Sequence, residues 1–221
     1  MTFQAFVTRR TALALGAGAL AAAGLPTFPA MAQNTKASTD QLMAKQALPD
    51  VWMGKENAPV TIIEYASMTC SHCASFHAGT FKELKSKYID TGKVRMTLRE
   101  FPFDPLATAA FMLARCEGPE KRGAMIDLLF AKQRDWAASD KPFDGLVALT
   151  KQAGMSQDAF EKCLKDKDLY YNVSKVRDQG TEKFNVRSTP TFFINGTMLT
   201  GDLPLDQFAK IIDSLVAGNK K

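Results

Sequence analysis

The chain has 221 residues, of which 46% are hydrophobic and 23% are charged. This is enough for one sizeable core, or for one domain that carries an insertion. The net charge is +5, and the basic residues are scattered along the chain. This argues against a nucleic-acid-binding patch and favours an ordinary solvated surface. The cysteines number four, and an even count suits an oxidising compartment.

The N-terminus has the pattern of a signal peptide, residues 1–32. Arg9 and Arg10 precede an uncharged stretch rich in Ala, Leu and Gly, and Ala30-Met31-Ala32 supplies a cleavage site. Cleavage after Ala32 would leave a mature chain exported to the periplasm. The alternative is an uncleaved membrane anchor, but such a span would have to include two prolines. Because Ala12 stands where a twin-arginine signal usually has Phe, the export route stays open.

The first half of the mature chain predicts a strand–helix–strand unit. Residues 33–54 are polar and irregular at first, and we expect them to pack lightly; they are too short for a dimerisation domain, so a monomer is expected. Residues 60–66 are apolar on both faces, which suits a central strand. A helix over residues 71–89 and an alternating strand over 94–101 follow, so a right-handed parallel unit is the default expectation.

The pattern then becomes helical before sheet character returns. The candidate helices are residues 106–116, 119–136, 143–153, 156–164 and 168–184. The apolar run 191–194, Asn195-Gly196 and the run 197–200 predict a β-hairpin, and residues 204–217 form an amphipathic helix. This order fits an α/β protein with an open sheet, helices on both faces and an inserted helical domain.

The candidate reactive residues are in the motif Cys70-Ser71-His72-Cys73, which lies between the expected strand 60–66 and the start of the helix that follows it. Free N–H groups at a helix start favour a negative sulfur, so Cys70 is the candidate nucleophile. Cys73, one turn further on, is the candidate resolving thiol. His72 favours the Cys70 thiolate further if its imidazole is positive or donates a hydrogen bond. A stabilised thiolate stabilises the reduced pair and makes the disulfide a strong oxidant.

Other uses of this motif are less economical. Haem attachment needs His directly after the second cysteine, where Ala74 stands. A zinc site would crowd three ligands of one helical turn, with His77 as the fourth, and rarely closes a tetrahedron. An inert structural disulfide is disfavoured because a helix start polarises an exposed dithiol. We therefore expect neither a metal nor a cofactor.

Further residues bear on the redox interpretation. Glu64 lies on the apolar strand, where a buried carboxyl could relay a proton to the inner thiol, or it could face solvent at the strand end. His77 is expected to be a packing or surface residue. Cys116 and Cys163 most simply pair with each other in an oxidising compartment; the alternative is two free buried thiols.

Two segments resemble the DsbA family of thiol:disulfide oxidoreductases. They are residues 64–73, which contain the dithiol, and residues 188–196, Ser-Thr-Pro-Thr-Phe-Phe-Ile-Asn-Gly. The resemblance extends from about Asn57 to the C-terminus. It implies a thioredoxin fold formed by residues 33–102 and 185–221, with an inserted α-helical domain over residues 103–184.

The resemblance also implies roles and partners. Cys70 would form a mixed disulfide that Cys73 resolves, Thr189-Pro190 would be a cis pair facing the dithiol, and Glu64 would be the buried acid below it. Family members donate disulfides to newly exported, unfolded proteins and are reoxidised by a quinone-linked membrane partner of the DsbB type.

Two features depart from the best-known members. Ser71 replaces Pro in the dipeptide, and the Cys116/Cys163 pair resembles the alphaproteobacterial branch. The alternative functions are a disulfide isomerase or reductase, and a thioredoxin-like binding or chaperone module.

Overall fold

The computed structural model describes residues 36–218, and the predicted signal peptide lies outside them. The strands are β1 (Trp52–Met53), β2 (Val60–Ala66), β3 (Val94–Glu100), β4 (Thr191–Ile194) and β5 (Thr197–Thr200). The helices are α1 (Thr39–Met43), α2 (Ser71–Ala78), α3 (Thr80–Leu84), the π-helical turn η1 (Lys85–Ile89), α4 (Pro105–Cys116), α5 (Pro119–Ala131), α6 (Gln133–Ala137), α7 (Pro142–Gln152), α8 (Gln157–Leu164), α9 (Lys167–Phe184) and α10 (Leu205–Gly218). Within the described range, no helix has the length and apolarity that crossing a bilayer requires.

The strands form one sheet in the order β1-β3-β2-β4-β5. β2 and β3 are parallel, with Val60 opposite Val94, which confirms the predicted strand–helix–strand unit. β4 and β5 pair antiparallel across Asn195 and Gly196, whose φ angles are 43° and 89°. Positive φ at both central residues is what a tight type I′ hairpin requires, so the Asn-Gly prediction is confirmed.

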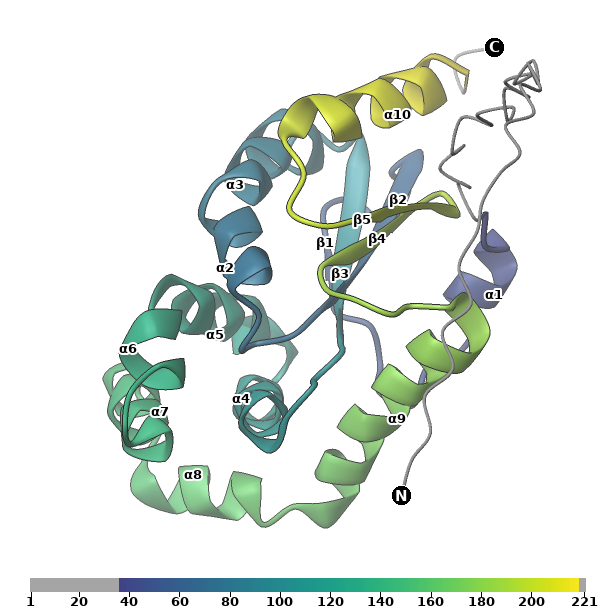
Figure 1. Ribbon diagram of the computed structural model, residues 1–221. Coiled ribbons are helices and arrows are strands. Elements are labelled where there is room, and N and C mark those ends of the chain that lie inside the picture. Colours follow the sequence, from purple (N-terminus) through teal and green to yellow (C-terminus); the bar gives the residue numbers. More distant parts are fainter. Residues whose placement is uncertain (1–35, 219–221) are drawn as a thin grey trace, which may run out of the picture. The chain divides into compact units, whose positions relative to one another are not determined.

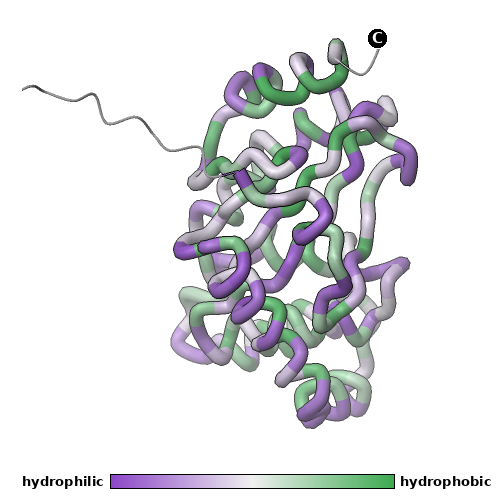
Figure 2. The backbone as a smooth tube through the Cα atoms, turned by 90° about the vertical axis from the view of Figure 1, so that its right-hand side faces the viewer, coloured by the Kyte–Doolittle hydropathy of each residue, from purple (hydrophilic) through white to green (hydrophobic). Residues whose placement is uncertain are grey.

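Helices cover both faces of the sheet, which keeps β2 buried on both sides (Figure 1). On one face, Ile62 packs in a cluster with Phe76 of α2 and Phe208 of α10. On the other face, Tyr65 packs with Phe184 of α9, in the cluster that also contains Leu42 of α1. Alternate residues of one strand therefore serve two cores. Hydrophobic and hydrophilic segments alternate along α10, the amphipathic pattern expected from the sequence (Figure 2).

Two helices expected to be continuous are interrupted, which corrects the predictions over residues 71–89 and 119–136. At Gly79, φ is −118° and ψ is −92°, so α2 ends and α3 begins at Thr80. Glycine leaves the helical region at little cost, which explains a break at this point. The second helix is split at Lys132 into α5 and α6.

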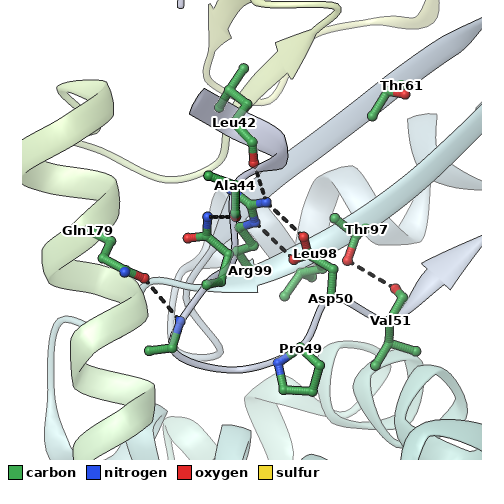
Figure 3. Close-up of polar contacts among 12 residues, drawn as sticks. Leu42, Ala44, Pro49, Asp50, Val51, Thr61, Thr97, Leu98, Arg99 and Gln179 are labelled. Atoms are coloured by element: carbon green, nitrogen blue, oxygen red, sulfur yellow. Dashed lines mark hydrogen bonds and ion pairs between the residues drawn. The ribbon is translucent and has the colours of Figure 1, made fainter. Parts of the chain in front are cut away.

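The segment before β2 packs firmly, which corrects the expectation of a lightly packed leader. Leu42 is 2% exposed, and β1 adds an antiparallel strand beside β3. Arg99 donates to the Asp50 carboxylate at 2.9 and 2.7 Å and to the Leu42 carbonyl at 2.6 Å (Figure 3). Because Arg99 is itself buried, these contacts satisfy a guanidinium that would otherwise be costly to bury.

The helical segment is joined to the sheet and to itself by polar and covalent contacts. Glu100, at the end of β3, accepts hydrogen bonds of 2.7 Å from Arg115 of α4 and from Arg122 of α5. Burial would raise the pKa of Glu100, but the two guanidinium groups outweigh it and hold this pKa at about 2. A disulfide joins Cys116 to Cys163, 47 residues apart, and so links α4 to α8.

Candidate active site

Cys70 is the N-cap residue of α2, at the junction between the central strand and the helix. Its backbone N–H donates to the Ser67 carbonyl at 3.1 Å, and its carbonyl accepts from Ala74 N at 3.1 Å, so the turn is closed on both sides. The backbone N–H groups of His72 and Cys73 are directed at the Cys70 sulfur. These are the donors that a helix start leaves without partners, and they favour a thiolate.

The two thiols have opposite environments, and both are free in the structure. The hydrogen bond from the Cys73 thiol is the main cause that lowers the pKa of Cys70 to about 5, and it outweighs the partial burial of Cys70. Cys73 is fully buried, and burial is the main cause that raises its pKa, followed by its hydrogen bond to Cys70 and the charge of Glu64. At neutral pH the negative charge therefore resides on Cys70 and the proton on Cys73.

The Thr189-Pro190 peptide bond is cis and lies beside Cys70. In the thiol form, Cys70 Sγ–H donates to the Thr189 carbonyl at 3.4 Å. A thiolate cannot donate, and the Thr189 hydroxyl then becomes the useful partner. This hydroxyl is buried and has no hydrogen-bond partner among the described residues, so it is free to turn to the sulfur, and its influence lowers the pKa of Cys70. Residues 119 positions apart thus meet at one sulfur.

His72 occupies the site differently from the expectation based on its imidazole. Its side chain is exposed, and the group that acts on the Cys70 sulfur is its backbone N–H. This contribution depends on the position at the helix start and not on the identity of the side chain.

Glu64 is fully buried, so the alternative in which it faces solvent is wrong. Its two carboxylate oxygens lie 3.1 and 3.3 Å from Nε2 of His77. His77 is buried as well, and its ring stacks on Phe130 with centroids 4.4 Å apart. The expectation that His77 packs was right, but its pairing with Glu64 was missed. The available signal was the i, i+4 spacing from Cys73, which places both side chains on one face of α2.

Sequence reasoning also missed two side chains that hold the dithiol turn. Gln133 of α6 donates from Nε2 to the carbonyls of Met68 and Cys70, at 2.8 and 3.0 Å. The Thr69 hydroxyl donates to Asp104 at 2.6 Å, and Asp104 caps α4 by accepting from Ala107 N. The segment after β3 therefore fixes the backbone that carries Cys70.

The arrangement is suited to thiol–disulfide exchange. An accessible thiolate supplies the nucleophile, and a buried protonated thiol is the partner that is released or attacks. Across residues 36–218, no three side chains of His, Cys, Asp or Glu gather as a metal site would need.

Comparison with known sequences gives the same class. A family model described as Thioredoxin matches residues 46–214. The "Putative protein-disulfide oxidoreductase" of Rickettsia bellii is 31% identical over 172 residues, which are 77% of this chain and 66% of that protein. The chain thus spans just under two thirds of this relative. The disulfide bond formation protein D of Bacillus subtilis is 25% identical and is covered over 77% of its length.

Among solved structures, Wolbachia pipientis alpha-DsbA1 has 31% sequence identity and a TM-score of 0.74, over 82% of this chain and 97% of that one. Fold and site together define a thioredoxin-fold protein with an exchange-competent dithiol. The chain belongs to the DsbA family of thiol:disulfide oxidoreductases.

Proposed function

We propose that this protein is a periplasmic oxidase that donates its Cys70–Cys73 disulfide to newly exported, unfolded proteins. The observation that supports it most is the unequal dithiol, with the pKa of Cys70 at about 5 and that of Cys73 raised. A stabilised Cys70 thiolate favours the reduced pair, so passing the disulfide to a substrate is downhill.

In the proposed reaction, a substrate thiolate attacks Cys70 Sγ of the oxidised protein. A mixed disulfide forms, the Cys70–Cys73 bond breaks, and Cys73 leaves with the electron pair and takes up a proton. A second substrate thiolate then attacks the substrate sulfur, and Cys70 leaves as a thiolate. The substrate has lost two electrons and the dithiol has gained them. Thr189-Pro190 would hold the substrate chain in this step, and the contact of the Thr189 carbonyl with Cys70 supports that role.

The remaining parts of the proposal concern context. The protein acts as a monomer without a cofactor, after removal of residues 1–32, and a quinone-linked membrane oxidase of the DsbB type withdraws the two electrons. Residues 33–102 and 185–221 form the thioredoxin-like domain. Residues 103–184 form the inserted domain, which supplies Gln133 and Asp104 to the dithiol turn.

Mixing the oxidised protein with a reduced, unfolded protein tests the proposal. The expected result is rapid transfer, with one Cys70–Cys73 disulfide reduced for each disulfide formed. A Cys73→Ser variant, first activated at Cys70 as a mixed disulfide with glutathione, should exchange glutathione for a substrate with a single cysteine and retain it at Cys70, because that substrate has no second thiol to release it. Refolding of a scrambled substrate alone would indicate an isomerase, and absence of exchange would indicate a binding module; either result contradicts an oxidase.

A further inference from the structure

The reaction requires Cys73 to gain a proton when it leaves Cys70 and to lose one when the disulfide reforms. Cys73 and Glu64 both have 0% exposure, so neither exchanges protons with bulk water directly. Cys70 cannot supply the proton, because its sulfur is bonded to the substrate at that moment. A path through the protein is therefore needed.

Glu64 is the first group on such a path. Its carboxylate lies 3.1 Å from His77 Nε2, one turn of α2 after Cys73, and its charge acts on Cys73. Among the described residues, the hydrogen bonds of its carboxylate go to His77 Nε2. The other nitrogen, Nδ1, is buried, has no hydrogen-bond partner in the described part of the chain, and lies 3.9 Å from Asp127 Oδ1. An imidazole can accept a proton on one nitrogen and release one from the other.

Beyond His77 the path reaches solvent. A cavity of about 420 Å³ is lined by His77 and Asp127 together with Phe81 and Phe130. The Asp127 side chain is 62% exposed. A separation of 3.9 Å is too long for a direct hydrogen bond, and a small rotation of the exposed Asp127 side chain would close it. The cavity has room for several waters that carry the proton onward.

We propose that His77 and Asp127 form the outer part of a proton path, Cys73–Glu64–His77–Asp127–solvent, that serves the buried thiol during exchange. The proton shared by Glu64 and His77 passes to the departing Cys73 sulfur, and His77 Nδ1 takes a replacement from the cavity beside Asp127. Reoxidation runs the same transfers in reverse, and no electrons move along the path. His77 and Asp127 act through Glu64 and do not touch the reacting sulfurs.

Charged groups from several elements face His77 and set its environment. Glu64 lies on β2, Asp127 and Arg122 lie on α5, and Lys82 and Lys85 lie on α3 and η1. Lys82 and Lys85 line the cavity together with Asp127, so the path ends among groups of both signs.

The test separates formation of the mixed disulfide from its resolution by Cys73. Reduced protein is mixed rapidly with oxidised glutathione, quenched with acid at set times, and analysed by mass. The variants are His77→Ala and Asp127→Asn, and Glu120→Gln is the control, an exposed acid on the same helix away from the cavity. Asp127→Asn changes an exposed side chain, so it keeps the test valid even if His77→Ala folds poorly.

A side chain that transfers a proton directly to or from the reacting atom raises the rate about 100-fold or more. Because His77 acts through Glu64, we expect His77→Ala to slow resolution by a smaller factor, about tenfold. Formation of the mixed disulfide should be unchanged. Asp127→Asn should slow resolution less and flatten its pH profile. Added imidazole should restore the rate of His77→Ala, by entering the cavity, without affecting the wild type or Glu120→Gln.

The proposal is overturned if Asp127→Asn keeps the wild-type rate and pH profile, or if imidazole fails to rescue a folded His77→Ala. This inference rests on the proposed function only for the direction in which the proton moves, toward Cys73 during donation and away from it during reoxidation. Disulfide transfer by the wild-type protein distinguishes failure of the proton path from failure of the proposed oxidase function. If the oxidised wild type transfers its disulfide to an unfolded protein, the oxidase proposal stands even where the variants refute the proton path.

Discussion

At the scale of single residues, the site depends on the unequal pKa values of its two thiols, which leave the proton on Cys73 and the negative charge on Cys70. Cys70 and Cys73 are a helical turn apart, yet the N–H groups of the helix start act on one sulfur and burial acts on the other. The motif alone predicted which thiol attacks. It could not reveal the Glu64–His77 contact or Gln133, because those contacts are set by packing between α2, β2 and α6.

Replacing Thr189 by Val should raise the pKa of Cys70 from about 5 toward its ordinary range. The change removes a buried hydroxyl that is free to donate to the thiolate, and it keeps the shape of the side chain. A hydrogen bond to a charged group is worth roughly 1.5–3 kcal/mol, and partial solvent exposure reduces this, so we expect a rise of about one pH unit. The measurement is the pH dependence of iodoacetamide alkylation of the reduced protein. Ser188→Ala, an exposed neighbour, is the control, and equal midpoints in the two variants would contradict the assignment.

At the scale of elements, the sheet and the later helices followed from sequence patterns, while the helix breaks did not. The alternation over residues 94–101 and the Asn195-Gly196 turn are local signals, and both were confirmed. The break at Lys132 comes directly before Gln133, whose side chain hydrogen-bonds the dithiol turn, a contact that is distant in the sequence. The leader was misjudged because its partner, Arg99, lies on β3.

Gln133→Ala should destabilise the protein and loosen the dithiol turn. The variant leaves two carbonyl acceptors without their donor, at a cost of about 1–3 kcal/mol. Urea unfolding of the reduced protein measures the loss, and Gln157→Ala is the control because Gln157 is exposed. We expect the control to change stability by less than about 0.5 kcal/mol. Equal effects of the two substitutions would remove the assigned role of Gln133.

Arg99→Leu should release the leader from the sheet. Asp50 would remain without its buried partner, and breaking such a pair costs about 3–5 kcal/mol. Limited proteolysis should then cut within residues 36–53 faster than in the wild type, and the free energy of unfolding should fall. Lys87→Met breaks an exposed ion pair with Glu83 and should cost at most about 1 kcal/mol. A leader that stays protected in Arg99→Leu would show that apolar packing alone holds it.

At the scale of the whole molecule, the thioredoxin fold and membership of the DsbA family were predictable and are confirmed. Two short motifs, around Cys70 and around Pro190, were specific enough to fix both. The fold brings these motifs together because β2 and β4 are neighbours in the sheet, although they are far apart in the chain. Because the lowered pKa of Cys70 exists only in the reduced protein, the redox state of the dithiol should affect the stability of the whole molecule.

The stability gap between the reduced and oxidised proteins should depend on pH. The folded pKa of Cys70 is lowered from 9.0 to about 5, so its contribution is fully present above about pH 9 and is lost as the pH falls through 5. The oxidised protein has no thiol to titrate at this site. Denaturant unfolding of both forms should show the reduced form gaining stability relative to the oxidised form from pH 5 to 8. A Cys70→Ser variant, which has no oxidised form of its own, should show no such gain when its stability is compared with that of the oxidised wild type. A gap that does not vary with pH would contradict the thiolate assignment.

The most direct test of the central claim is the equilibrium of the Cys70–Cys73 couple with glutathione at pH 7. If the Cys70 thiolate stabilises the reduced protein, the couple should be strongly oxidising, with a potential nearer to the about −120 mV of DsbA itself than to the about −270 mV of thioredoxin. A value at or below about −270 mV would mean that the disulfide is kept instead of donated, and would contradict the proposed oxidase.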